Sequence, residues 1–402
     1  MAPTDNAPPR ALTSVALYVG GALGPLGGSV VQPMLPELAV GLRTSTATAA
    51  ASLTVYFLPY AALLLVSGTL GERWGRRRTV RWAFVAYAVA SLGCAVAPTA
   101  GTFLLGRATQ GVVNAFTTPL VLAGLSELEP RAHLGRRVGI FGAFQAAGVS
   151  LGPFLGGIAA GWNWRVAFVA VAAIAGLLTL APPDGAPRRA AASPSFRSLL
   201  GAPMATLCVC GFGIGSCVVG TGFLVALRLR DDLGTSPGVA GVVLVGFGLA
   251  GLLVGPLGGR VTDRIDAAVT GPLAAGTAAG LLLVAGRADG LPALAALWVG
   301  TGAAASLLVV SVQRLTVEAV PANRGGAASV QSAFRFLGSA VAPALWLPVA
   351  TRSIPVAFAG AAGGSLLSGV ALLAHRRLRD GGALSDPGSS TPVRGRRTPR
   401  SR

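Results

Sequence analysis

The sequence contains no lysine, only 14 acidic residues and only four cysteines among its 402 residues. Charged residues make up 11% of the chain. Because soluble domains carry roughly 25%, a soluble globular protein is excluded. The four cysteines lie inside apolar stretches, where we expect small packing residues rather than disulfides or metal ligands. There is no nucleophile–base pair, ligand cluster or Walker-type loop, so no enzymatic activity, metal site or cofactor is predicted.

Long apolar stretches dominate what is present. Hydrophobic residues form 52% of the chain, in stretches of about 20 residues that can each cross a bilayer core of about 30 Å. The chain is therefore predicted to be an all-α polytopic membrane protein with about twelve transmembrane helices. The predicted spans are centred near Gly24, Leu58, Ala88, Ala115, Gly148, Ala172, Gly215, Gly248, Ala278, Ala303, Leu337 and Leu366.

All 32 basic residues are arginine, and they give the chain a net charge of +18. They are concentrated in the gaps between apolar stretches and in the C-terminal tail. With a cytoplasmic N-terminus, 24 arginines fall on the cytoplasmic side and six on the opposite side, while Arg107 and Arg335 fall within spans. This bias follows the positive-inside rule, so both termini are predicted to be cytoplasmic and nucleic acid is not an expected partner.

The longest internal connection divides the spans six and six. It covers residues 182–203 and contains five prolines and three arginines, which is typical of a linker. The tail is rich in arginine, glycine, serine and proline, a composition that predicts disorder. The predicted units are a cytoplasmic tail (1–10), a first six-helix bundle (11–181), the linker (182–203), a second six-helix bundle (204–375) and a basic tail (376–402).

The two halves repeat in sequence. GTLGERWG in the first half matches GRVTDRID in the second, which places Glu72 opposite Asp263 at an offset of 191 residues. PRAHLGRRVGIFGAFQAAGVSLGP, which ends at Pro153, resembles PANRGGAASVQSAFRFLGSAVAP, which ends at Pro343, at an offset of 190. Parallel six-span halves predict a transporter with a pseudo-twofold axis along the membrane normal.

Four motifs in the first half carry a resemblance to a known family. They are, in chain order, LGGSVVQPMLP, GTLGERWGRRRTV, RATQGVVNA and GVSLGPFLGG. Together they resemble the major facilitator superfamily, specifically its twelve-span drug:proton antiporter branch. The resemblance implies two pseudo-symmetric six-helix bundles that open alternately to either side of the membrane.

The charged turn within Gly68–Val80 is a predicted gate. Its glycines allow a tight reversal of the chain, and Glu72 stands where the family usually has aspartate. By the resemblance, Glu72 accepts hydrogen bonds from the start of the eleventh helix, and Asp263 does so toward the fifth. An arginine cluster that only sets topology is the alternative. The gating candidates of the two turns are Gly68, Glu72, Arg73, Gly75, Arg76, Asp263 and Arg264.

The fifth span combines small residues with a proline. Small residues four apart permit close helix contact, and a mid-span proline frees a backbone carbonyl and kinks the helix. The eleventh span has a proline at the equivalent position, which predicts a rocking contact; ordinary membrane-helix packing is the alternative. The residues concerned are Gly148, Gly152, Gly156, Gly157, Pro153 and Pro343.

Arg107 begins a polar face on the fourth span. It lies about 10 Å into the span at 1.5 Å per residue, and Gln110, Asn114 and Thr118 follow on the same face. Intramembrane arginine is costly and usually faces a cavity. The resemblance implies a role in proton coupling or substrate binding. The alternative is a structural arginine that reaches toward the interface.

Arg335 lies near the middle of the eleventh span, with Gln331 and Ser339 on the same face. The repeat makes Gln145 its equivalent, because each lies eight residues before its proline. We expect Arg335 to face the central cavity, where it favours an anionic or carbonyl-rich substrate. Neutralisation by a helix C-terminus or by backbone carbonyls is the alternative.

None of the acidic residues is placed mid-span, although a proton-coupled antiporter needs a titratable group. Glu37, next to the first-helix motif, is the candidate; Gln32, one turn deeper, does not titrate. A solvated loop carboxylate is the alternative for Glu37.

We therefore predict a monomeric cell-membrane transporter that exports a small, partly apolar molecule in exchange for protons. The implied partners are the small-molecule substrate, protons and the lipid bilayer. One alternative is a sugar or metabolite permease without proton coupling. The residues QPMLP in the first span also resemble the first-helix motif of that branch. Another is a receptor or assembly factor that transports nothing; the turn and the fifth span argue against it because both serve motion.

Overall fold

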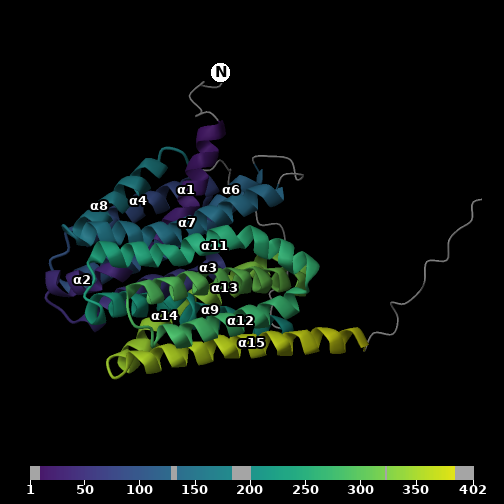
Figure 1. Cartoon of the computed structure of the whole chain (residues 1–402). Helices are drawn as coiled ribbons and strands as arrows, with labels where there is room; N and C mark the ends of the chain where they lie inside the picture. The colour runs from purple at the N-terminus through teal and green to yellow at the C-terminus, as the bar shows by residue number, and fades with distance from the viewer. Residues whose placement is uncertain (1–9, 128–133, 183–200, 322–323, 385–402) are drawn as a thin grey trace, which may run out of the picture.

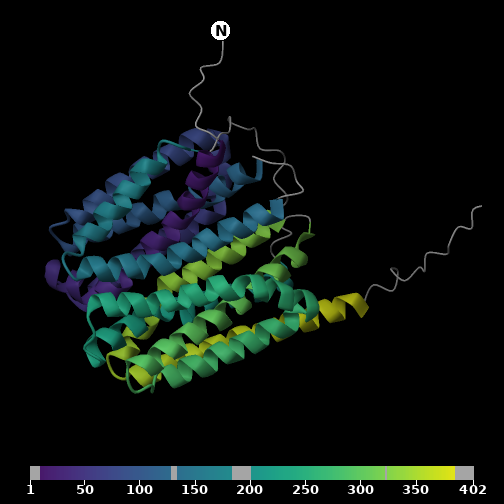
Figure 2. The same ribbon diagram turned by 45° about the horizontal axis from the view of Figure 1, so that its top comes forward.

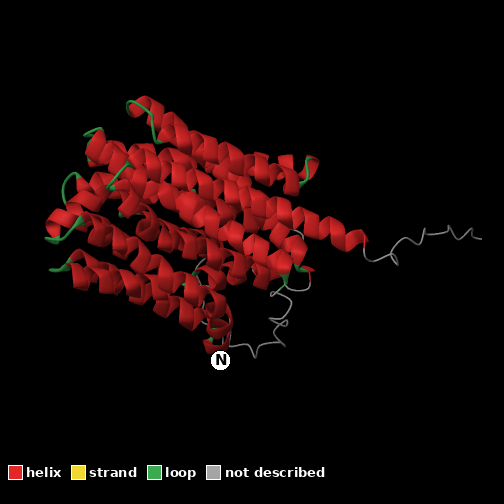
Figure 3. Cartoon of the chain, turned by 90° about the horizontal axis from the view of Figure 1, so that it is seen from below, coloured by secondary structure: helices red, strands yellow, loops and turns green. Residues whose placement is uncertain are grey.

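The computed structural model describes residues 10–127, 134–182, 201–321 and 324–384, and every regular element within them is helical (Figure 3). The first half makes six passes. They are α1 (Arg10–Ser29) continued by η1 (Gln32–Met34) and α2 (Leu35–Gly41), α3 (Thr46–Trp74), α4 (Arg76–Ala95), α5 (Ala100–Asn114) continued by α6 (Thr118–Glu127), α7 (Leu134–Ala160) and α8 (Arg165–Leu178).

The second half makes six more passes, so the predicted all-α fold is confirmed. They are α9 (Ala202–Cys217) continued by η4 (Val219–Thr221), α10 (Gly222–Leu227) and the π-helical turn η5 (Arg228–Asp232), then α11 (Pro237–Arg264), α12 (Ala267–Ala285), α13 (Leu291–Ala319), α14 (Arg324–Ala350) and α15 (Ile354–Leu384).

Length and composition allow eight of the described helical stretches to cross a membrane, and the shorter apolar helices Ala147–Ala160 and α8 add to them. Large apolar side chains such as Leu105, Leu253 and Leu367 are exposed on the outside of the bundle. Exposed aliphatic side chains on continuous helices are expected where lipid, rather than water, is the solvent.

The helices begin where the sequence offers caps. Ser45 accepts a hydrogen bond from the Thr48 amide, and Thr99 forms a reciprocal capping box with Thr102. Ser236 caps α11 in the same way. These caps lie in short connections at one end of the bundle, which we call the α2 end. The opposite end, where the first helix starts and the last one finishes, is the terminal end (Figure 1).

The two halves form separate bundles that meet along two helix pairs (Figures 1 and 2). The second pass, α3, packs on the eleventh, α14, and the fifth, α7, packs on the eighth, α11. A pseudo-twofold axis superposes each pass on the pass six positions away in the chain. This operation turns the α3–α14 contact into the α7–α11 contact, and the reverse. The interface therefore has the symmetry that the sequence repeat predicts.

Three boundaries differ from the sequence-based expectation. Ala115 was the expected centre of the fourth span, but it lies in a break between α5 and α6, where the Thr117 hydroxyl donates to the backbone carbonyl of Asn114. The turn within Gly68–Val80 shrinks to Gly75, whose φ of 92° favours glycine.

The third difference is at the C-terminus. The predicted tail after His375 begins as helix, because α15 continues to Leu384. Arg379 lies in this extension and pairs with Asp266, the N-cap of α12. The linker residues 183–200 and the tail residues 385–402 lie outside the described ranges.

Candidate functional site

The predicted polar face of α5 is buried inside the first bundle. Arg107 is 0% exposed, and its Nη1 donates to the Gly27 carbonyl of α1 at 2.9 Å and to Oε1 of Gln110 at 2.7 Å. Gln110 Nε2 in turn donates to the Ser91 hydroxyl of α4 at 2.7 Å. Arg107 therefore ties three helices together, and its guanidinium does not reach the bundle surface.

Two tyrosines complete this network, although the sequence analysis did not single them out. The Arg107 guanidinium carbon lies 4.3 Å from the ring centroid of Tyr56, a cation–π geometry. The Tyr56 hydroxyl donates to the Gly24 carbonyl at 2.8 Å and lies 3.3 Å from the Tyr87 hydroxyl. Within the described residues, Arg107 Nε and Nη2 have no hydrogen-bond partner, so the face of the Tyr56 ring compensates this part of the guanidinium charge.

Asn114 belongs to the same face and closes it at the helix break. Its side-chain oxygen accepts from the Thr117 hydroxyl at 2.9 Å, while its buried Nδ2 has no hydrogen-bond partner in the part of the chain that the structure describes. The side chain packs against Gly24 of α1, where a Cβ would lie 2.5 Å from Oδ1. A larger residue at Gly24 would therefore force the Asn114 side chain to move.

Arg335 of α14 has a different environment. It is half-buried, and in the described part of the chain its side chain forms no hydrogen bond and no ion pair. Its guanidinium carbon lies 4.8 Å from the centroid of the Phe336 ring. Across the interface, Tyr60 of α3 lies close enough to interact electrostatically with Arg335. The Tyr60 hydroxyl donates to the Thr118 hydroxyl at 3.4 Å.

Aromatic rings join the two halves beside Arg335. Phe336 of α14 stacks on Phe57 of α3 at a centroid distance of 5.9 Å and meets Tyr60 edge-on at 4.6 Å. One turn toward the α2 end, the Thr54 hydroxyl donates to the Ala340 carbonyl at 2.5 Å. Tyr56, which lies under Arg107, and Tyr60, which lies near Arg335, are one turn apart on α3. Both arginines therefore lie next to the same helix.

The three predicted glutamines other than Gln110 separate in the structure. Gln331 is 3% exposed and packs on Gly211 of α9, where a Cβ would lie 2.8 Å from its Nε2. Gln145 is half-buried on α7. Gln32 reaches across to Gly222 of α10 in the other half, where a Cβ would lie 2.7 Å from its Oε1. Only Gln32 therefore contacts the opposite bundle through a described close approach.

Glu37 forms an ion pair between the halves, and its partner Arg230 was missed by the sequence analysis. The carboxylate at the start of α2 binds Arg230 of η5, and the two side chains are 21% and 17% exposed. Arg230 also donates to the Thr235 carbonyl at 2.5 Å. The pair joins the first and seventh passes, which are equivalent under the repeat. Glu37 is thus a partnered residue rather than a solvated loop carboxylate.

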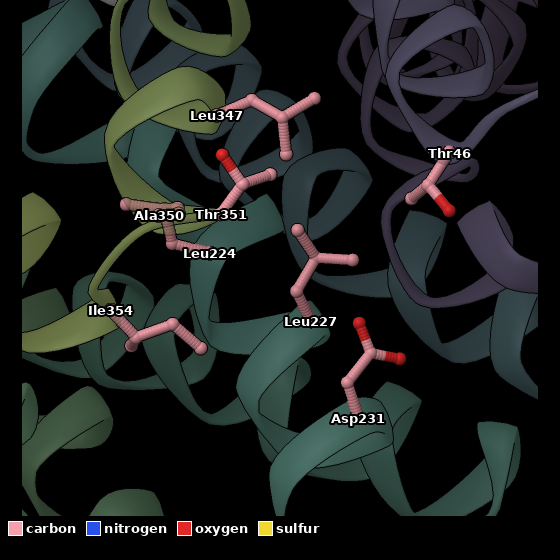
Figure 4. Close-up of a pocket in the computed structure, with 8 residues that line it drawn as sticks. All are labelled: Thr46, Leu224, Leu227, Asp231, Leu347, Ala350, Thr351 and Ile354. Carbon is pink, nitrogen blue, oxygen red and sulfur yellow. The ribbon is translucent and has the colours of Figure 1, made fainter.

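Two pockets flank the interface at the α2 end. One, of about 420 Å³, lies beside the Glu37–Arg230 pair and is bordered by Trp162 and Trp164. The other, of about 190 Å³, lies between the halves, with Thr46 on one side and Leu227 and Asp231 on the other (Figure 4). The second pocket is lined mainly by aliphatic side chains, and the Asp231 carboxylate is its charged group.

At the terminal end, Glu72 is held within its own turn. Arg76 is 3% exposed and donates to Glu72 through Nε at 2.7 Å and through Nη2 at 2.6 Å. Arg73 and Arg264 are exposed. The side chain of Asp263 lies outside the described residues, as does that of Arg324 at the start of α14. The predicted contact of Glu72 with the eleventh helix stays a prediction.

The predicted fifth-span glycines lie at backbone contacts with two different helices. A Cβ on Gly152 would lie 2.7 Å from the Leu26 carbonyl oxygen, and Gly148 also faces α1, inside the same bundle. Gly156 faces Val30, directly after α1. Gly157 alone faces the other half. Its Cβ would lie 2.9 Å from the Cα of Gly241 in α11, while a Cβ on Gly241 would lie 2.6 Å from the Pro153 carbonyl oxygen.

The prolines of the repeat lie inside α7 and α14, as the sequence predicts. Both helices are among those that form the contacts between the halves. The two repeat-related prolines therefore lie on helices that change neighbours if the bundles rock. Pro343 is followed in α14 by Pro348.

Two helical bundles with a polar, arginine-containing interior are the architecture of a membrane transporter. A family model described as Major Facilitator Superfamily matches residues 17–227 and 207–400. The chain belongs to the major facilitator superfamily, whose members carry small-molecule substrates across membranes and are not enzymes.

Two relatives that are named for drug resistance or drug efflux match parts of the chain. The puromycin resistance protein pur8 of Streptomyces alboniger is 34% identical over 158 residues, 38% of this chain and 31% of the relative. The multidrug efflux pump LfrA of Mycolicibacterium smegmatis is 34% identical over 183 residues, 44% of this chain and 36% of the relative. The chain thus spans about a third of the length of these curated relatives. The resemblance to the drug-efflux branch is supported.

Solved structures share the fold. A bacterial homolog of the human lysosomal transporter Spinster, inward-facing and unoccupied, matches with a TM-score of 0.72 at 16% identity and covers 95% of this chain and 99% of its own. The nucleoside transporter NupG, in a mutant form, matches with a TM-score of 0.73 at 14% identity and covers 90% and 99%. At these identities the likeness establishes the fold alone.

Proposed function

We propose that the protein exports a small, partly apolar molecule across the cell membrane by alternating access, in exchange for protons. The terminal end faces the cytoplasm and the α2 end faces outward. The arginine bias of 24 to six supports this orientation. The names of the related drug exporters support export, since both describe resistance or efflux.

The observation that carries the proposal is the ion pair between Glu37 and Arg230. It joins the ends of two pseudo-equivalent helices from opposite halves, so it must break whenever the α2 end opens. A carboxylate at this place links opening to a proton, because protonation removes the charge that Arg230 binds. In the 420 Å³ pocket beside the pair, Glu37 and Arg230 are the charged lining residues; Asp231 and Asp232 follow Arg230 on η5.

The cycle takes up a proton on one side of the membrane and releases it on the other. With the α2 end open, Glu37 accepts a proton from the outside while Arg230 is released. The α2 end closes over the neutral carboxyl, and the proton leaves toward the cytoplasm as the Glu37–Arg230 pair re-forms and the terminal end opens. Substrate that enters from the cytoplasm then breaks the pair and is carried outward, so each cycle moves one proton inward and one substrate molecule outward.

Transport in a pump-deficient bacterial host tests the proposal. Expression should raise resistance to at least one compound of a panel of ethidium, puromycin, norfloxacin and benzoate, and a proton uncoupler should abolish the gain. Glu37→Gln should lose the proton dependence, whereas Asp289→Asn, which removes an exposed carboxylate from another connection at the same end, should behave as wild type. Transport that persists with uncoupler would reject proton exchange and favour the uncoupled permease.

A further inference from the structure

In the described spans, the interior of the bundle carries positive charge without a matching carboxylate. Arg107 and Arg335 are the charged residues in the middle of the described spans, and the described acidic residues lie at helix ends or in connections. A charged group inside a membrane protein is costly unless another group compensates it. The two arginines differ in how this is done.

Arg107 is compensated by the protein. Its guanidinium bonds to Gly27 and Gln110, stacks on Tyr56 and is 0% exposed. A ligand reaches it only after these contacts are broken. Arg107 is therefore part of the scaffold in this conformation.

Arg335 is not compensated in this way. It is half-buried, and among the described residues no acceptor and no carboxylate binds its side chain. Its position on α14, at the contact with α3 of the other bundle, places it where the halves separate. A guanidinium in that environment gains most from a planar anion, because a carboxylate can accept two parallel N–H bonds.

The surroundings of Arg335 define the rest of the ligand. Phe336 and Phe57 stack on each other across the α3–α14 contact, and Tyr60 meets Phe336 edge-on, so these rings can receive a ligand only once the two halves move apart. Aromatic walls favour a flat apolar body over a sugar or a highly hydrated ion. The same face carries no described acidic group that would bind a cationic drug.

We infer that Arg335 anchors an aromatic or similarly flat organic monoanion, with its carboxylate on the guanidinium and its apolar body against Phe336 and Phe57. Such an anion is the substrate class of the proposed exporter. That the bound anion is transported rests on the proposed function. An anionic lipid headgroup offers the same charge; the soluble carboxylate is favoured because the rings, rather than a row of further basic side chains, surround the guanidinium.

Ligands of equal shape and different charge test the inference. Purified full-length protein in nanodiscs of zwitterionic lipid is titrated with 2-naphthoate, neutral 2-naphthamide and cationic 2-naphthylmethylammonium, and binding is measured by calorimetry and by the midpoint of thermal unfolding. Wild type should bind naphthoate about tenfold or more tightly than the other two, the factor that corresponds to one charge-assisted interaction. Equal binding of all three, or preference for the cation, would overturn the inference.

Variants separate recognition from folding. Arg335→Gln should lose the preference for naphthoate, and Arg335→Lys should keep part of it, because lysine restores the charge without the planar fork. Arg352→Gln removes an exposed arginine from a connection at the α2 end and should match wild type. If Arg335→Gln binds naphthoate as wild type does, Arg335 is not the anchor.

Two further outcomes distinguish the inference from the proposed function. Loss of naphthoate binding on addition of anionic phosphatidylglycerol to the nanodiscs would identify a lipid headgroup as the occupant and reject the soluble anion. Selective naphthoate binding without any transport would leave the inference standing and reject export. Export of cationic compounds without anion binding would support export and reject the inference about Arg335.

Discussion

Removing one charge from the Glu37–Arg230 pair should open the α2 end. Glu37→Gln keeps the size and the hydrogen-bonding groups of the side chain but removes the charge that Arg230 binds. The same opening is expected from Arg230→Gln. Exchange of the two residues, Glu37→Arg with Arg230→Glu, should restore closure because the attraction is retained with its direction reversed.

The size of the effect follows from burial. Unit charges about 4 Å apart attract by about 4 kcal/mol at an effective dielectric constant of about 20. Both side chains are about four-fifths buried, so desolvation offsets part of this attraction. A net value of about 1–3 kcal/mol then shifts the equilibrium between closed and open forms by about 5- to 150-fold.

Thiol labelling measures that shift. The four native cysteines are buried, and Gln32→Cys places a thiol between the halves beside Gly222. In nanodiscs, where both membrane faces are accessible, a membrane-impermeant maleimide should react at least about five times faster in either single variant than in the Gln32→Cys background. Asp289→Asn is the matched control. Unchanged labelling in both single variants, or a charge exchange that labels as fast as they do, would refute the role of the pair.

Two further perturbations test the contact between halves and the C-terminal helix. Gly157→Ala should lower transport and destabilise the protein by about 1–3 kcal/mol, because its Cβ would lie 2.9 Å from Gly241 Cα. Gly176→Ala is the control, since a Cβ there has nothing within 4 Å. Equal thermal unfolding midpoints of the two variants would contradict the close contact. Hydrogen bonds from the Arg379 guanidinium and, second, from the Ala268 amide lower the pKa of the Asp266 carboxyl. The ionised carboxylate therefore stabilises the folded protein above the unfolded-state pKa of about 3.9. This stabilisation is lost as the pH falls through the folded-state pKa. Asp266→Asn should therefore lower the unfolding midpoint at pH 6, and the difference should shrink as the pH falls below about 3.9. A difference that stays constant as the pH is lowered would contradict this assignment.

The fold could be predicted because membrane spans are encoded locally. Apolar length located the passes, and the residue spacing on α5 correctly brought Arg107, Gln110 and Asn114 onto one face. The break after Asn114 was missed, since it depends on hydrogen bonds from Thr117 that an apolar stretch does not reveal.

The partners across the bundles could not be predicted in the same way. Glu37 and Arg230 are 193 residues apart, and nothing in either local pattern fixes which side chain meets which. The repeat held a usable signal, because an offset of about 191 places Glu37 and Arg230 on equivalent passes. The spacing of Tyr56 and Tyr60, one helical turn apart, was a second signal for a polar line along α3.

The contact between Gly157 and Gly241 has a thermodynamic consequence for any ligand of this protein. With no side chain between the two backbones, the bundles can pivot there under the proposed cycle, and opening one end closes the other. A molecule that binds only when the α2 end is open must then weaken the binding of ligands at the terminal end. Those ligands weaken the binding of that molecule by the same factor. Inhibitors directed at opposite ends of this protein should consequently antagonise one another.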